Sequence, residues 1–166
     1  MITNLLIQNG AWSGVAFSTG DNASGNPASA NRHSKSIDCS GYVSWVLYKY
    51  GCQTGKEDYK TLFSKQKSTS EMKTIFNNNS SLFKKVGTLG DCTLQSGDIL
   101  LRSGTHVEIY KFYGTVHNNT NPEKTSTNKY ACYSAGSTAQ IQNPYLASYG
   151  TCNDSTSSYT VYRVIQ

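Results

Sequence analysis

The sequence lacks the features that mark metal-binding and membrane proteins. Its 166 residues include five cysteines, but no two of them form a C-x-x-C pair, and no cluster of Cys and His has the spacing of a zinc site. No apolar run is long enough to cross a membrane as a helix. We therefore expect no metal, no cofactor and no membrane span.

Other absences bear on export and on domain organisation. Residues 1–8 have no basic start and too short an apolar run, so they do not form a standard secretory signal. Repeats and an interdomain linker are also missing. A chain of 166 residues with 37% hydrophobic and only 15% charged residues fits one compact domain. We expect a single domain over residues 1–166 that acts as a monomer.

Positive charge is concentrated in one part of the chain. The formal net charge is +5, and the excess of lysine lies in residues 56–86. This part predicts helices: Ser68 and Glu71 form a capping-box pattern, and a stripe of residues precedes it. The members of that stripe are Tyr59, Leu62, Phe63 and Gln66. Because no nucleic-acid-binding motif accompanies the lysines, a solvated helical face is the better interpretation.

The most informative segment, residues 37–50, places a cysteine at the start of a predicted helix. Asp38 can cap this helix, and Gly51 is expected to end it. The core-facing stripe has the i, i+3, i+4, i+7 spacing and consists of Val43, Val46, Leu47 and Tyr50. Cys39 then lies in the first turn, where the helix dipole favours a thiolate and hence a nucleophile. The alternative is a buried structural cysteine.

A second segment, residues 95–113, predicts two strands joined by a tight turn at Ser103 and Gly104. His106 stands near the start of the second strand. Strand alternation places His106, Glu108 and Tyr110 on one face and Val107, Ile109 and Lys111 on the other. The imidazole is therefore free to face a cleft, although an ordinary surface histidine is the alternative.

Together the two segments resemble the NlpC-type cell-wall cysteine peptidases, distant relatives of papain. The matching residues are Asp38-Cys39-Ser40-Gly41-Tyr42-Val43, Gly97-Asp98-Ile99-Leu100 and His106-Val107-Glu108-Ile109-Tyr110. The resemblance covers residues 37–51 and 95–113 and extends more weakly through 130–142. It implies Cys39 as nucleophile and His106 as base, supported by Asp38 and Ser40. It also implies hydrolysis of amide bonds in the peptide stems of bacterial peptidoglycan, commonly next to D-glutamate, with no metal.

The resemblance also implies a third polar residue that orients the imidazole from the strand after the histidine strand. The best-matching position is Ser134, whose hydroxyl can accept the imidazole N–H. A buried water or a backbone carbonyl could do so instead, and Ser134 is then only a strand residue. Glu108 is a further candidate for tuning the cleft. However, residues i and i+2 of a strand are about 6.6 Å apart along the chain, too far for a simple hydrogen bond without help from rotamers.

The oxyanion site departs from the family pattern. Many relatives carry a tyrosine shortly before the nucleophile helix that helps to form this site, yet residues 1–41 contain none. The backbone N–H of Cys39 is an available donor, and residues 12–20 are placed to form a wall of the cleft. We therefore expect the oxyanion to be held by donors other than a tyrosine.

The order of predicted elements favours an α+β fold. A loop-rich region through Lys35 precedes the Cys39 helix and one or two further helices to about Asn77. The strands are expected near 82–86, 98–102, 106–113, 129–135 and 159–166, with polar surface loops at 18–36, 114–128 and 143–158. The resemblance implies a papain-like core, in which the nucleophile helix packs on a small antiparallel sheet or half-barrel.

The expected function is that of a thiol endopeptidase cutting within the peptidoglycan stem peptide. The motifs equally allow an N-acetylmuramoyl-L-alanine amidase or another thiol acyl hydrolase or transferase, and a wall- or glycan-binding module without turnover is a third reading. Because the substrate lies outside bacterial cells, we expect an extracellular or a phagocytic (lysosomal) compartment. The remaining cysteines form up to two disulfides or stay reduced: Cys52, Cys92, Cys132 and Cys152.

Overall fold

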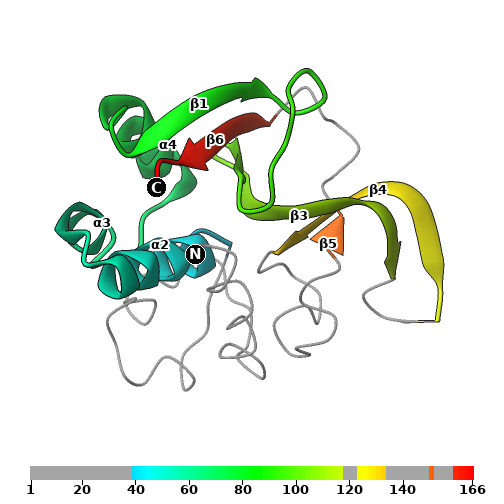
Figure 1. Ribbon diagram of the computed structural model, residues 1–166, viewed down its shortest axis with the longest axis horizontal. Helices are drawn as coiled ribbons and strands as arrows, with labels where there is room; N and C mark the ends of the chain where they lie inside the picture. The colour runs from blue at the N-terminus through cyan, green and yellow to red at the C-terminus, as the bar shows by residue number, and fades with distance from the viewer. Residues whose placement is uncertain (1–38, 118–122, 134–149, 152–158) are drawn as a thin grey trace.

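The computed structural model describes residues 39–117, 123–133, 150–151 and 159–166 (Figure 1). In these ranges three helices precede all six strands, and the strands form one antiparallel sheet. The predicted α+β class is confirmed. None of the helices in the described ranges is long and apolar enough to span a membrane.

The first helix, α2 (Cys39–Thr54), has the buried face that the sequence predicts. The expected stripe of Val43, Val46, Leu47 and Tyr50 is buried, and Tyr42 and Trp45 are buried with it. The core therefore encloses this helix on more than one face. This burial fixes the place of its N-terminal turn, which carries Cys39.

The helix does not end at Gly51 as predicted. It continues to Thr54 and is followed by Gly55, whose φ is 69°. A Cβ atom at Gly51 would lie 2.9 Å from the backbone O of Lys56 and 2.9 Å from the backbone N of Lys60. Because Gly51 has no side chain, α3 (Glu57–Leu62) can pack closely against α2 at this position.

The last helix, α4 (Thr69–Asn78), begins with the predicted capping box. The backbone N–H of Glu71 donates to Ser68 Oγ (3.2 Å), and the backbone N–H of Ser68 donates to Glu71 Oε2 (2.8 Å). Two orphan N–H groups are thus satisfied. The predicted stripe through Gln66 is wrong at its end, because α3 stops at Leu62 and Gln66 lies in the connection to α4.

The sheet has the strand order β1-β6-β2-β3-β4-β5, and every pair is antiparallel. Its strands are β1 (Phe83–Thr88), β2 (Ile99–Arg102), β3 (His106–His117), β4 (Thr125–Tyr133), β5 (Gly150–Thr151) and β6 (Thr160–Val164). The last strand of the chain therefore lies between β1 and β2. Figure 1 shows the helices gathered near one end of the sheet, while the β3–β4 hairpin extends away from them.

Two predicted loops contain strand. β3 and β4 extend into the expected loop 114–128, where Val116 pairs with Ser126, and β5 falls within the expected loop 143–158. The polar composition of these segments favoured loops. Thr is β-branched and suits an extended strand, and in a long hairpin the backbone pairing does not require apolar side chains.

Buried side chains gather on both faces of the sheet. The larger cluster joins the helices to one face and includes Val107 and Ile109 of β3. A smaller cluster covers the other face and includes Leu100, Tyr110 and Tyr159. The alternation predicted for β3 is therefore confirmed, and His106 and Glu108 belong to the strand positions facing away from the helix-side core.

Candidate active site

Cys39 occupies the first turn of α2 with a partly buried side chain that packs against the helix-side core. Its thiol is free. The backbone N–H groups of a first helical turn have no intrahelical partner and form the positive end of the dipole. An anion that develops next to Cys39 is therefore in a favourable field.

His106 is the first residue of β3 and follows the turn of residues 103–105. The backbone N–H of Thr105 donates to Arg102 O (3.0 Å), and Gly104 adopts a φ of 78° that suits glycine. The N–H of Gly104 also donates to Thr69 Oγ1 (3.0 Å) at the start of α4. These contacts fix the turn against the helical layer and so place the imidazole.

The two predicted catalytic residues come within interacting distance, because the side chain of Cys39 contributes to the raised pKa of His106. Burial by itself lowers the pKa of His106, whose side chain is only 24% exposed. The hydrogen bonds to Cys39 and Glu108, together with the charge of Glu108, outweigh burial and raise this pKa to about 9. An imidazolium is therefore favoured beside the sulfur at neutral pH.

The carboxylate of Glu108 lies next to the imidazole of His106. Its Oε2 is 3.5 Å from Nε2 of His106, and its side chain is only 2% exposed. The other oxygen, Oε1, is buried and has no hydrogen-bond partner in the described part of the chain. The backbone spacing of these two strand residues is too long for a direct contact, and the conformations of their side chains bridge it, as the sequence allowed.

Sequence reasoning missed two residues beside this group. Arg102 is the cross-strand neighbour of His106, and its guanidinium Cζ lies 5.0 Å from the ring centroid of the buried Tyr159. A hairpin with a three-residue loop places the residue before the turn opposite the residue after it, so the pattern around residues 103–105 could have identified Arg102. No local pattern marks Tyr159, which precedes β6.

Of the other predicted site residues, the structure describes Ser40 but not Asp38 or Ser134. Ser40 is buried in the first turn of α2, next to Cys39. Asp38 and Ser134, as well as the expected cleft wall at residues 12–20, lie outside the described residues. Their roles stay predictions.

The cysteines divide into free thiols and a disulfide. Cys39, Cys52 and Cys92 are free, whereas Cys132 on β4 is disulfide-bonded. Cys152 lies outside the described residues. Because Cys52 and Cys92 are free, the alternative with two disulfides is wrong. Within the described ranges, no group of three or more His, Cys, Asp or Glu side chains is arranged to hold a metal ion.

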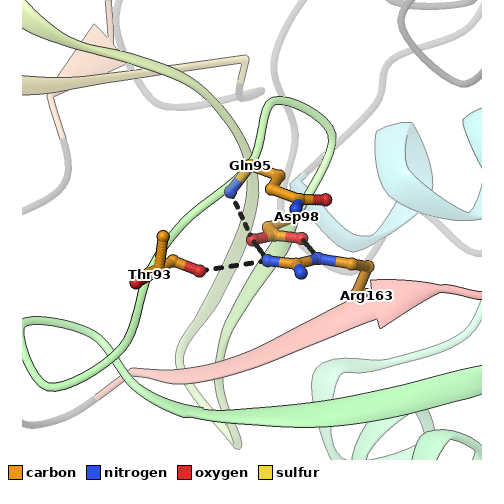
Figure 2. Close-up of polar contacts among 4 residues, drawn as sticks. All are labelled: Thr93, Gln95, Asp98 and Arg163. Carbon is orange, nitrogen blue, oxygen red and sulfur yellow. Dashed lines mark hydrogen bonds and ion pairs between the residues drawn. The ribbon is translucent and has the colours of Figure 1, made fainter.

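Asp98, which belongs to the motif before the histidine, forms a structural clamp with β6 (Figure 2). Arg163 donates to its two carboxylate oxygens from Nε (2.7 Å) and Nη2 (2.8 Å). The backbone N–H of Gln95 donates to Asp98 Oδ2 (2.8 Å), and Arg163 Nη2 donates to Thr93 O (3.1 Å). Asp98 is 1% exposed. This pairing fixes the start of the hairpin that carries His106.

A cavity of about 290 Å³ lies beside this clamp, lined by residues 95–98 and by Arg163, Val164 and Gln166. Its two charged side chains, Asp98 and Arg163, neutralise each other. None of its lining residues belongs to the group around Cys39 and His106. We therefore place the candidate active site at the thiol–imidazole pair and not at this cavity.

Chemically, the arrangement offers a thiol, an imidazole that can accept and donate a proton, and a carboxylate that stabilises the protonated ring. This set suits nucleophilic attack on a carbonyl carbon followed by protonation of a leaving amine. Comparison of the chain with protein-family models, with curated proteins and with solved structures finds no match. Any functional assignment therefore rests on these residues and their geometry.

Proposed function

We propose that this protein is a thiol endopeptidase that cleaves amide bonds in the peptide stems of bacterial peptidoglycan. The observation that carries this proposal is the interaction of the Cys39 side chain with the imidazole of His106, which two distant segments of the chain bring together. A buried carboxylate, Glu108, backs the imidazole. The resemblance in residues 37–51 and 95–113 supplies the substrate class.

In the proposed mechanism, the sulfur of Cys39 attacks the carbonyl carbon of the scissile amide. Backbone N–H groups of the first turn of α2 stabilise the oxyanion. As the C–N bond breaks, protonated His106 gives its proton to the departing amine, leaving a thioester on Cys39. His106 then takes a proton from water, whose oxygen attacks the thioester carbon; the C–S bond breaks, the acid product leaves, and His106 returns the proton to the sulfur of Cys39.

The disulfide-bonded Cys132 supports an oxidising compartment for the proposed enzyme. Disulfides persist in extracellular and lumenal environments and are rare where thiol reductants are abundant. Such a compartment, extracellular or phagocytic, is also where peptidoglycan is found.

The direct test compares the wild type with Cys39→Ala on purified peptidoglycan and on stem peptides, with products identified by mass spectrometry. We expect release of peptide fragments by the wild type and a loss of at least about 10³-fold in the variant, because no other group replaces the nucleophile. Cys52→Ala is the matched control, since Cys52 is a free, exposed cysteine of the same helix. Equal release by wild type and Cys39→Ala would end the proposal.

The product masses also separate the alternatives. Cleavage between sugar and stem would identify an amidase, and a product joined to an added amine would identify a transferase. A wall-binding module would release nothing but would sediment with peptidoglycan. If Cys39 is the nucleophile, iodoacetamide at about pH 6 should alkylate it faster than the more exposed Cys52.

A further inference from the structure

Arg102 lies next to the candidate active site, and its guanidinium has no ion-pair partner among the described residues. It ends β2 directly opposite His106, and its half-buried guanidinium stacks on the buried ring of Tyr159 with 5.0 Å from Cζ to the ring centroid. Stacking on an aromatic face holds the planar fork in one orientation. The position and the orientation of this cation are therefore fixed.

Among the described residues, Arg102 has no hydrogen bond or ion pair, and its Nε is buried without a partner. Arg163 provides a contrast within the same sheet, because it donates to both oxygens of Asp98 at 2.7 and 2.8 Å. Burial of an unpaired polar group costs free energy. A guanidinium also matches a carboxylate with two parallel hydrogen bonds. Arg102 thus lacks the anion that its chemistry favours.

Glu108, an acidic residue on the same face of the sheet, does not fill this role. Glu108 has its Oε2 on His106 at 3.5 Å, and no ion pair joins it to Arg102 among the described residues. Arg102, Glu108 and Cys39 nevertheless lie within electrostatic range of one ring, that of Tyr159. Burial chiefly raises the pKa of Tyr159 to about 12, and Glu108 and Cys39 raise it further while Arg102 opposes them. The guanidinium of Arg102, the thiol of Cys39 and the carboxylate of Glu108 therefore all act on the ring of Tyr159.

We propose that Arg102 is a specificity-determining residue that binds a free carboxylate of a substrate residue flanking the scissile amide. This inference rests on the proposed function. In a stem peptide with a γ-linked D-glutamate, the α-carboxylate of that residue is free and lies next to the peptide bond. Where the following residue is a diamino dicarboxylic acid or ends the peptide, its free carboxylate is a second source of the same chemistry.

The test uses three stem peptides that are identical except at their carboxylates. One carries both free carboxylates, one has the D-glutamyl α-carboxylate converted to an amide, and one has the carboxylate of the following residue converted to an amide. We expect the wild type to lose about 10- to 100-fold in kcat/KM on one of the two amidated peptides, as for loss of a charged hydrogen bond. The peptide that is affected identifies the carboxylate.

Arg102→Gln should cleave the peptide with both free carboxylates as slowly as the wild type cleaves the affected amidated peptide. On that amidated peptide, kcat/KM of Arg102→Gln should equal that of the wild type. Arg102→Lys, which keeps the charge but not the fork, should retain part of the preference. Thermal unfolding and the rate of alkylation of Cys39 should stay close to the wild type, and they report on folding and on the thiol separately.

The outcomes separate this inference from the proposed function. Equal cleavage of all three peptides by the wild type would overturn the role of Arg102 and leave the peptidase intact. Equal loss on all three peptides in both Arg102 variants would show a supporting role without carboxylate recognition, and would also overturn it. If the wild type cleaves none of the peptides or purified peptidoglycan, the proposed function fails, and this inference fails with it.

Discussion

The imidazole of His106 is held from two sides, by the thiol of Cys39 and by the carboxylate of Glu108. A carboxylate that is only 2% exposed loses most of its hydration, so it needs a compensating positive charge nearby. Protonated His106 supplies this charge. Glu108 is therefore placed to stabilise the imidazolium and, in the proposed enzyme, to orient the ring as the acidic member of a catalytic triad does.

Replacing Glu108 with Gln keeps the shape of the side chain but removes its charge. Burial lowers the pKa of His106, but interactions with Cys39 and with Glu108 raise it to about 9, so the variant, which loses the contribution of Glu108, should have a lower pKa. The alkaline limb of kcat/KM for stem-peptide cleavage should then move from near pH 9 toward the ordinary value near 6.5. An NMR titration of the imidazole should move in parallel, and an unchanged limb would contradict this role.

The Glu108→Gln substitution should also alter how the free energy of unfolding depends on pH. A histidine whose pKa is raised in the folded state stabilises the fold fully below its ordinary pKa, and this contribution is lost as the pH rises through the raised value. The free energy of unfolding of the wild type should therefore exceed that of Glu108→Gln most below pH 6.5. The difference should shrink progressively as the pH approaches about 9. Urea unfolding at several pH values measures this difference. A constant difference across this range would contradict the linkage.

At the residue scale, the family resemblance paired Cys39 with His106, and strand alternation placed Glu108 on the face of His106. The sequence did not predict Arg102 and Tyr159 beside them. Cys39 and His106 are each marked by a helix or hairpin pattern of their own. The contact of Glu108 with His106 depends on side-chain rotamers, and the stacking of Arg102 on Tyr159 depends on the pairing of β2 with β6. Neither is encoded in a local pattern.

At the element scale, Gly51 shows how a local signal can be misread. A glycine after an apolar stripe is a common helix end, yet here it lies within α2 and allows α3 to approach its backbone. The φ value that requires glycine occurs at Gly55, four residues later. The close approach helps to bury Tyr59, which makes an edge-to-face contact with Tyr50 of α2 at 5.0 Å.

Gly51→Ala should therefore destabilise the protein even though alanine favours helices. The added Cβ would lie 2.9 Å from backbone atoms of Lys56 and Lys60, which cannot move without shifting α3. We expect a loss of about 1–3 kcal/mol in the free energy of unfolding, as for overpacking. Urea unfolding measures it. Gln53→Ala, at an exposed position of the same helix, is the control and should change stability by less than about 0.5 kcal/mol; a similar effect of both would refute the packing role.

At the scale of the whole molecule, the C-terminal strand links the parts of the sheet. β6 pairs with β1 on one side and with β2 on the other, so the end of the chain joins the strand after α4 to the hairpin that carries His106. The clamp between Arg163 of β6 and Asp98 lies at the start of that hairpin (Figure 2). The backbone N–H of Tyr110 also donates to Asp98 O (2.8 Å).

Asp98→Asn should weaken this connection, because it removes one charge of a buried pair and leaves a guanidinium without its carboxylate. Breaking such a pair costs roughly 3–5 kcal/mol, and we expect the lower end because the side chain of Arg163 is 26% exposed. The melting temperature measures the loss. Asp91→Asn, at an exposed position, should be nearly neutral, and equal shifts in the two variants would disprove the clamp.

The sequence by itself determined the elements that carry the site. Helical periodicity located the Cys39 helix, a capping box located the start of α4, and turn chemistry located the hairpin before His106, because each of these signals acts over a few neighbouring residues. Only the tertiary structure decided the contact of Glu108 with His106, the place of Arg102 on Tyr159 and the position of β6. These depend on rotamers and on pairing between distant segments, which local sequence does not record.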